Sequence, residues 1–228
     1  MNKKIRAVIV LSFLLVTSFS ILIPTVDAAS PASYVTITLT NSQTTPTPVN
    51  FQQLIKVDWS TYASDLNANV SNVRFYNSTS FSSSTELSGW IETNNTTTAT
   101  SSNVWVNLSG TIVPASGTAT IYMAFLPTTS SWSSHWGLAP TLSTKYGQFD
   151  NGASVFTNYW NFAGTTLPTG WSGSGETVNN GIYTNASGDY ASYSFSAAKD
   201  APFCSCWERC LLEGYLVPRG TNGCEGTI

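Results

Sequence analysis

The sequence predicts an all-β protein made of antiparallel β-sandwiches of the jelly-roll or immunoglobulin-like kind, the second of them incomplete. Short segments alternate apolar residues with Thr, Ser or Tyr, and turn-forming residues separate them about every ten residues. No long segment shows the apolar 3.6-residue period of an amphipathic helix. Charged residues make up only 9% of the chain, which suits sheets whose outer faces are covered by hydroxyl groups.

The alternation is strictest at residues 34–40, where Tyr34 and three Thr residues face one way. Val35, Ile37 and Leu39 face the other way, as in a strand with one buried face. Further strands are predicted at residues 51–59, 72–76, 87–92, 104–108 and 117–125. Together they predict a first sandwich over residues 32–127, a usual domain size.

A connector rich in aromatic residues is expected at residues 128–147, followed by a new strand pattern at residues 148–198. The new pattern includes residues 177–178, 181–183 and 190–195, each flanked by Gly, Asn or Ser. It predicts the opening strands of a second β-sandwich that is too short to close.

The first 28 residues match an export signal. Lys3, Lys4 and Arg6 precede an apolar run over residues 7–23, and small residues before Ala29 favour cleavage after Ala28. The alternative is an uncleaved membrane anchor, for which the run is slightly short. We therefore expect a secreted or cell-surface protein whose contact with a membrane, if the signal stays uncleaved, is through this segment.

Glycosylation sequons occur six times in the chain. In an exported protein they are acceptor sites on surface loops, although a chain rich in Asn, Ser and Thr also produces them by chance. The six asparagines are Asn69, Asn77, Asn94, Asn95, Asn107 and Asn185.

The composition changes abruptly at residues 199–228. All four cysteines lie there, at Cys204, Cys206, Cys210 and Cys224, together with a higher density of charge. A zinc site fits the spacing poorly, and two disulfides would allow three pairings. A third interpretation is that a frameshift or truncation produced this tail, and we favour it because the β pattern stops at the same point.

Several motifs resemble the domain of unknown function DUF2341 of exported archaeal and bacterial surface proteins. They are Trp90-Ile91-Glu92, the strand that ends Ile121-Tyr122-Met123, and the segment YGQFDNG at residues 146–152. The resemblance covers residues 34–163, and residues 161–167 with Trp171 resemble the start of a concanavalin A-like lectin or glucanase domain. It implies a cell-surface β-sandwich and supplies no catalytic residue; the chain departs from it after Ala198.

Few side chains are suited to catalysis, and we predict a protein that is not an enzyme. Glycoside hydrolysis needs two carboxylates at a defined separation, and Glu86 and Glu92 would be too far apart on one continuous strand. Glu92 is better explained as a structural carboxylate that holds a loop. His135, the single histidine, has no second His or Cys near it in the sequence to complete a transition-metal site.

No cofactor is expected, and calcium is the one ion the sequence leaves open. Asp150, Asn151 and Gly152 offer oxygen ligands in a turn, as calcium sites do. A simple turn explains the same three residues, because Asn and Gly tolerate positive φ, and we favour the turn.

Aromatic side chains cluster over forty residues of the connector and the second pattern. If exposed, they would form a platform that stacks on sugar rings; the alternative is a core between two domains, where Trp fills large volumes. Nucleic acid is an unlikely ligand, because the chain has a formal net charge of −3 and no basic patch. The five candidate ligand-binding residues are Trp132, Trp136, Tyr159, Trp160 and Trp171.

The function expected from the sequence is a non-enzymatic surface module that binds glycans or mediates adhesion. A structural subunit of a surface layer or filament is the first alternative, because sandwiches self-associate through open sheet edges. An accessory domain of a secreted glycoside hydrolase is the second.

Overall fold

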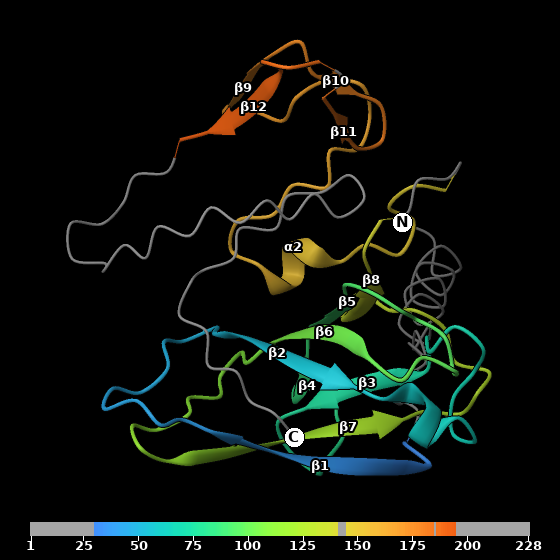
Figure 1. The fold of residues 1–228 in the computed structure, drawn as a ribbon. Coiled ribbons are helices and arrows are strands. Elements are labelled where there is room, and N and C mark those ends of the chain that lie inside the picture. The colour runs from blue at the N-terminus through green and yellow to red at the C-terminus, as the bar shows by residue number, and fades with distance from the viewer. Residues whose placement is uncertain (1–29, 141–144, 185, 195–228) are drawn as a thin grey trace, which may run out of the picture.

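The computed structural model describes residues 30–140, 145–184 and 186–194, and these residues form an all-β fold with antiparallel sheets. Two four-stranded sheets lie face to face, and two small two-stranded sheets follow (Figure 1). Sheet A has the strand order β1-β7-β3-β4, and sheet B has the order β2-β6-β5-β8. The strands of sheet A are β1 (Ser33–Thr40), β7 (Thr118–Phe125), β3 (Val73–Tyr76) and β4 (Glu86–Leu87). The strands of sheet B are β2 (Gln52–Val57), β6 (Ser102–Asn107), β5 (Gly89–Ile91) and β8 (Trp136–Leu138).

The alternating segment at residues 34–40 is β1, as predicted. It pairs antiparallel with β7 over its whole length, from Ser33 opposite Phe125 to Thr40 opposite Thr118. Ile37 and Leu39 point into the core, while the threonines of β1 are exposed. Because side chains alternate across a strand, this pattern fixes which face of sheet A is buried.

The core between the two sheets is rich in aromatic and β-branched side chains. Trp59, Phe75 and Trp136 meet there, with ring centroids of Phe75 and Trp136 5.6 Å apart and those of Trp59 and Trp136 6.5 Å apart. Trp59 lies in a short 3-10 helix, η1 (Trp59–Tyr62), which Asp58 caps by accepting from the Ser60 N–H at 3.0 Å. The strand predicted at residues 51–59 therefore ends at Val57, and the helix begins two residues later at Trp59.

The single strand predicted at residues 87–92 is wrong. The chain instead leaves sheet A after β4, passes Ser88 and enters sheet B as β5. Gly89 lies at this corner, and a Cβ atom there would be 2.9 Å from the ring of Trp136. The corner therefore needs a glycine, because the backbone passes directly over a buried indole.

The first sandwich extends beyond Pro127, the boundary predicted from the sequence. Residues 136–138, assigned above to a connector, form β8 and pair with β5. This pair is parallel, whereas every other strand pair in the described residues is antiparallel. The ladder closes sheet B and carries Trp136 into the core.

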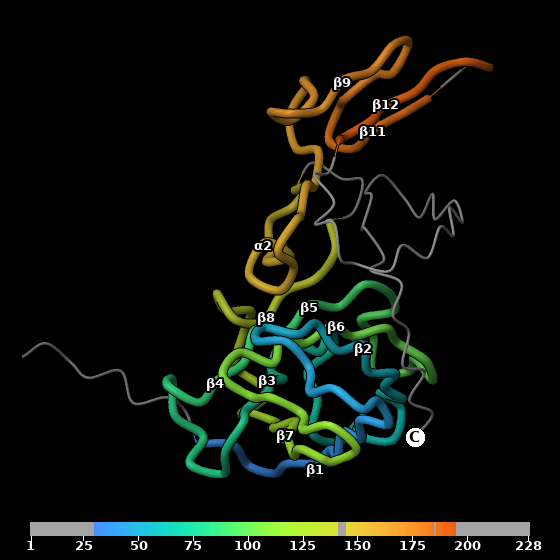
Figure 2. The backbone as a smooth tube through the Cα atoms, turned by 90° about the vertical axis from the view of Figure 1, so that its left-hand side faces the viewer, coloured from blue at the N-terminus to red at the C-terminus, as the bar shows by residue number. Residues whose placement is uncertain are grey.

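Residues 149–156 also belong to the first sandwich rather than to a second one. The Leu138 N–H donates to the Phe149 carbonyl at 3.0 Å, and the short helix α2 (Gly152–Val155) lies against β5 and β6. Beyond α2 come two antiparallel two-stranded sheets rather than a packed sandwich (Figure 2). They are β9 (Trp171–Ser174) with β12 (Tyr190–Tyr193), and β10 (Thr177–Val178) with β11 (Ile182–Tyr183).

The predicted signal at residues 1–28, Asn185 and the cysteine-containing tail at residues 199–228 lie outside the described residues. Among the residues that are described, no helix has the length and apolar character needed to cross a membrane.

Candidate functional site

The carboxylate of Asp150 joins the sandwich to the segment beyond it. Its Oδ1 accepts hydrogen bonds from the Trp90 Nε1–H at 3.0 Å, the Gly152 N–H at 3.0 Å and the Tyr159 hydroxyl at 2.8 Å. Its Oδ2 accepts from the Asn161 side-chain amide at 2.8 Å. One side chain thus fixes a core tryptophan, the start of α2 and two residues of the following loop.

Aromatic rings pack around this carboxylate. Trp90 is fully buried and meets Phe156 edge-on, with ring centroids 5.4 Å apart, and Tyr159 at 5.9 Å. Phe156 and Tyr159 stack at 6.0 Å with nearly parallel planes, and Trp105 of β6 also meets Phe156. A Cβ atom on Gly152 would lie 2.3 Å from the ring of Tyr159, so this packing requires a glycine in α2.

A pocket of about 510 Å³ lies beside the Asp150 carboxylate and the aromatic rings around it. Its volume lies within the range of small-molecule sites. Its wall combines the aromatic rings of Tyr159 and Trp160, with Phe162 as a third aromatic residue, and the polar groups of Asp150 and Asn161. The rest of the lining, none of it basic, is Ala153, Ala163, Thr166, Leu167, Pro168 and Thr169.

Tyr146 holds the backbone of Asn161, one of the residues that line the pocket. The hydroxyl of Tyr146 donates to the Asn161 carbonyl. Burial, together with the charges of Asp150 and Tyr183, raises the pKa of Tyr146 to about 12. The phenol therefore stays protonated and remains a hydrogen-bond donor across the physiological pH range.

The structure divides the five predicted aromatic residues between two places. Tyr159 and Trp160 line the pocket and are half-buried. Trp171 is not among the lining residues, and it meets Trp160 edge-on, with ring centroids 5.4 Å apart. Trp132 and Trp136 belong to the first sandwich, where their rings stack 6.2 Å apart.

The prediction that Trp136 binds a ligand is wrong for a physical reason. Its side chain is 0% exposed and its Nε1–H donates to the Val70 carbonyl at 2.9 Å, so no ring face reaches solvent. Trp132 is half-buried and stacks on Phe149 at 5.6 Å as well as on Trp136. The core interpretation therefore holds for Trp136, and Trp132 packs against the same core.

The described sequon asparagines differ in their surroundings. Asn69 and Asn94 are exposed, whereas Asn77 and Asn95 are partly buried. Asn107 lies on β6, and its side-chain amide donates to the carbonyls of Ser154 and Val155 in α2, at 3.2 and 3.4 Å. Its nitrogen is thus already engaged in the contact between the sandwich and α2.

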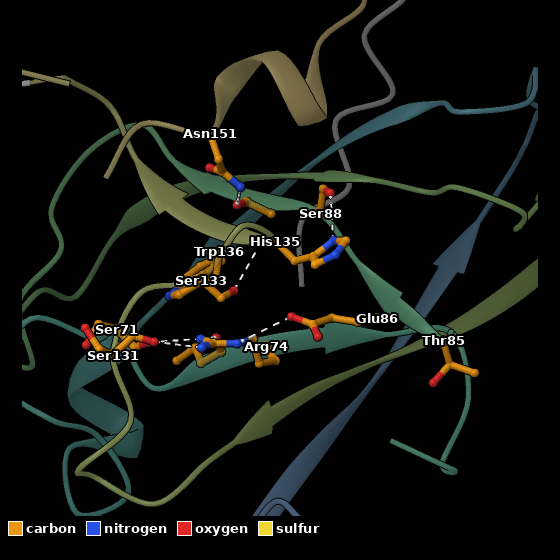
Figure 3. A network of polar contacts seen from close by, with 12 residues as sticks. Ser71, Arg74, Thr85, Glu86, Ser88, Ser131, Ser133, His135, Trp136 and Asn151 are labelled. Atoms are coloured by element: carbon orange, nitrogen blue, oxygen red, sulfur yellow. Dashed lines mark hydrogen bonds and ion pairs between the residues drawn. The ribbon is translucent and has the colours of Figure 1, made fainter. Parts of the chain in front are cut away.

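A second polar cluster lies on β3 and β4 (Figure 3). The guanidinium of Arg74 donates to the carbonyls of Ser71, Val73 and Ser131 at 2.9, 2.6 and 2.7 Å. Its Nε lies 3.4 Å from Oε1 of Glu86, and both side chains are almost completely buried. These contacts tie the loop before β8 to sheet A.

Burial governs the ionisation of this cluster. It raises the pKa of Glu86, and the nearby His135 and Arg74 side chains oppose that rise. It lowers the pKa of Arg74, which Glu86 opposes. It also raises the pKa of Tyr76 to about 12, with a further contribution from Glu86. A buried pair of this kind holds backbone in place and supplies little net stability.

The two carboxylates considered for glycoside hydrolysis lie on different sheets. Glu86 is in sheet A beside Arg74, whereas Glu92 follows β5 of sheet B and accepts from the Trp105 Nε1–H at 3.0 Å. Glu92 thus contacts a strand of sheet B rather than the loop that the sequence predicted. His135 Nδ1 lies 3.3 Å from the Ser88 hydroxyl at the sheet corner (Figure 3).

Residues 150–152 form the start of α2 rather than the predicted turn with positive φ: Asn151 precedes the helix with a φ of −124°, and Gly152 is its first residue. Three of the four hydrogen bonds to the Asp150 carboxylate are accepted by Oδ1 and only one by Oδ2, so Oδ2 keeps capacity to accept another. Among the described residues, no group of three or more His, Cys, Asp or Glu side chains could hold a metal ion.

One relative comes from an archaeal virus. The chain is 37% identical over 131 residues to a protein described as "Uncharacterized protein 562" of Sulfolobus islandicus rod-shaped virus 1. The match covers 58% of this chain and 22% of that much longer protein. No protein-family model matches the chain, and no solved structure does. The resemblances to DUF2341 and to concanavalin A-like domains stay predictions from the motifs.

The organising role of Asp150 and the contribution of Asn161 to the pocket were not predicted from the sequence. The DNG turn drew attention to Asp150, but nothing local indicated that Trp90, sixty residues earlier, donates to it. Asn161 directly follows Trp160, and this adjacency of an amide and an indole was the available signal.

Proposed function

We propose that the chain is a non-enzymatic binding module of the cell surface or extracellular space, and that the pocket beside Asp150 binds a neutral saccharide. The observation that supports this most is the lining itself. Trp160 and Tyr159 present aromatic surface, and Asp150, Asn161, Thr166 and Thr169 supply oxygen and nitrogen atoms around it. A sugar ring has the matching chemistry, with apolar C–H faces and a rim of hydroxyl groups.

The charge of the pocket lining favours a neutral ligand over an anionic one. The lining contains one acidic side chain and no basic one, which disfavours sulfated, phosphorylated or uronic saccharides. The viral relative is far longer than this chain, and a small binding module attached to other segments fits that relation. The two alternatives, a structural subunit and an accessory domain of a glycosidase, use the same sandwich but do not account for the pocket.

The test is binding of the full chain to a panel of neutral oligosaccharides, followed by titration calorimetry with any hit. We expect Trp160→Ala to abolish binding, because the largest aromatic ring of the pocket is lost while α2 and the sandwich stay intact. Tyr190→Ala is the matched control, since Tyr190 is 53% exposed on β12 and does not line the pocket. Absence of binding to every neutral saccharide, or equal losses in the two variants, would contradict the proposal. Preferential binding of small quaternary ammonium compounds would replace it, because aromatic rings and a carboxylate also suit such cations.

A further inference from the structure

The edge strands of the two sandwich sheets are not equally protected. Unpaired N–H and C=O groups on an edge strand template pairing with another chain, and proteins block them with short strands, charges, prolines or covering segments. β4 has only two residues and β8 only three, and the Phe149 carbonyl covers part of β8 by accepting from Leu138. These two edges therefore offer little to a partner.

The remaining two edges differ from one another. β2 carries an exposed charge at Lys56 and is followed by the exposed Asp58. β1 has eight residues, no charge and no proline. It is the one long uncharged edge among the described sheets, because the strands of the two-stranded sheets have four residues or fewer.

The free backbone groups of β1 can be assigned. The Asn41 N–H donates to the Gly117 carbonyl at 2.8 Å, which continues the register in which Thr40 lies opposite Thr118. Hydrogen-bonded pairs alternate along an antiparallel ladder, so the odd-numbered residues of β1 bond to β7. The N–H and C=O groups that point away from β7 then belong to Tyr34, Thr36, Thr38 and Thr40.

We infer that a second copy of this chain adds to β1 as an antiparallel strand, so that sheet A continues across a two-fold axis into sheet A of its partner. The sequence of β1 is complementary to itself about Ile37. With Ile37 opposite its symmetry mate, Val35 lies opposite Leu39 on the inner face, where both strands are apolar. On the outer face Tyr34 lies opposite Thr40 and Thr36 opposite Thr38.

This arrangement gives a hydrogen-bond partner to each backbone N–H and C=O group that points away from β7. The four outward-pointing residues of one copy meet the four of the other in hydrogen-bonded pairs. Pairs of β-branched and aromatic residues across strands stabilise such a ladder. Val35, which is only half-buried in one copy, gains Leu39 of its partner as a neighbour. No like charges meet, because β1 has none. The interface does not involve the pocket, so the test of dimerisation is independent of the test of saccharide binding.

Sedimentation of the full chain over a range of concentrations, with its four cysteines kept reduced, tests this inference. We expect a reversible dimer. Thr38→Pro removes an outward N–H that β7 does not use, and the dissociation constant should rise by about tenfold or more, because each interface loses two backbone hydrogen bonds. Thr38→Lys should weaken the dimer through charge at the edge.

Thr120→Lys is the matched control. Thr120 lies directly opposite Thr38 and is also exposed, but it is on β7 and not on the outer edge of β1. It should leave the dimer intact. Far-ultraviolet circular dichroism of each variant establishes that the sandwich is folded. If Thr38→Pro does not fold, Thr38→Lys is the variant that tests the interface.

Amide hydrogen exchange gives a second readout. At high protein concentration the amides of Tyr34, Thr36, Thr38 and Thr40 should be protected, and dilution or Thr38→Lys should release them together. A chain that is monomeric at all concentrations would overturn the inference, and so would oligomers that Thr38→Lys and Thr120→Lys affect equally. Pairing of β1 with another segment of its own chain would appear as protection that does not depend on concentration.

Discussion

The sandwich and the segment beyond α2 use the same aromatic residue types with different results. In the sandwich Trp59, Trp90 and Trp136 are each 0% exposed. Trp59 and Trp136 lie in the core between the two four-stranded sheets, whereas Trp90 is covered by Val155, Phe156 and Tyr159. Beyond α2, Trp160 and Trp171 are only half-buried. They pack on each other and on Tyr193, whose ring centroid lies 4.5 Å from that of Trp160, and Trp171 also packs on the buried Phe162 at 4.9 Å.

The difference follows from sheet size. A two-stranded ribbon has no second sheet to cover its side chains and is marginally stable by itself. Its aromatic residues must therefore provide both the packing and the accessible surface. A cluster of tryptophans in the sequence therefore does not define a binding platform. The layers around each ring decide whether it supports the fold or contacts a ligand.

Replacing one tryptophan from each region tests this comparison most directly. We expect Trp136→Ala to lower the free energy of unfolding by about 3–5 kcal/mol, as for other fully buried tryptophans. Trp160→Ala should cost roughly 1–2 kcal/mol, because part of its ring already faces water. Denaturant titration followed by circular dichroism measures both, and equal losses would remove the distinction between the two regions.

The junction between the regions should be nearly as sensitive. A Cβ atom on Gly137 would lie 2.2 Å from the Phe149 carbonyl oxygen and 2.3 Å from Oδ1 of Asn151. Gly137→Ala should therefore separate residues 149–151 from β8, at a cost of up to about 3 kcal/mol. Gly117→Ala is the comparison, since its nearest neighbour is the Pro114 side chain at 3.1 Å. Thermal unfolding should show a clearly larger loss for Gly137→Ala, and the opposite order would contradict the proposed junction.

Asp150 is the next point at which the connection can be weakened. Asp150→Ala leaves the Trp90, Tyr159 and Asn161 donors without their acceptor, which should cost about 1–2 kcal/mol. Asp150→Asn keeps one acceptor oxygen and should fall between the wild type and the alanine variant. Hydrogen exchange should increase at Gly152 and at the backbone around Tyr159 while β1 and β7 stay protected. Uniform loss of protection in both regions would show that they unfold as one unit.

The smallest expected effect is a pH dependence confined to the sandwich. The folded-state pKa of Glu86 is raised by burial, so the folded protein binds more protons than the unfolded chain in the window above the ordinary glutamate pKa. Stability should therefore fall as pH rises through that window. Glu86→Gln should remove this slope, which unfolding curves collected from pH 4 upward can measure. A wild-type stability that rises through the same window relative to Glu86→Gln would contradict the assigned direction.

The positions of most sandwich strands were predictable from local pattern. β1 alternates over its eight positions and β7 over its first six, and the pleat of a strand converts that alternation directly into a buried and an exposed face. The same reasoning failed at residues 87–92, because both halves of the turned segment are buried and the pattern contains no alternation to mark the corner at Ser88.

The candidate site was predictable only in part. The proximity of Tyr159 and Trp160 in the sequence indicated an aromatic surface, and both line the pocket. Trp136 gave the same signal although its ring is enclosed by the two sheets. Nothing in the sequence around Asp150 indicates a donor as distant as Trp90, because the contact exists only once β5 and β8 have paired.

The sequence by itself determined the all-β class, the strands with one buried face and the scarcity of ionisable groups, since these depend on composition and on the two-residue period of each strand. The tertiary structure alone decided the strand order of the two sheets, the parallel addition of β8 and the separation of buried from half-buried tryptophans. The physical reason is that burial depends on which distant segments cover a side chain, and pairing between such segments is not encoded in the local alternation of either one.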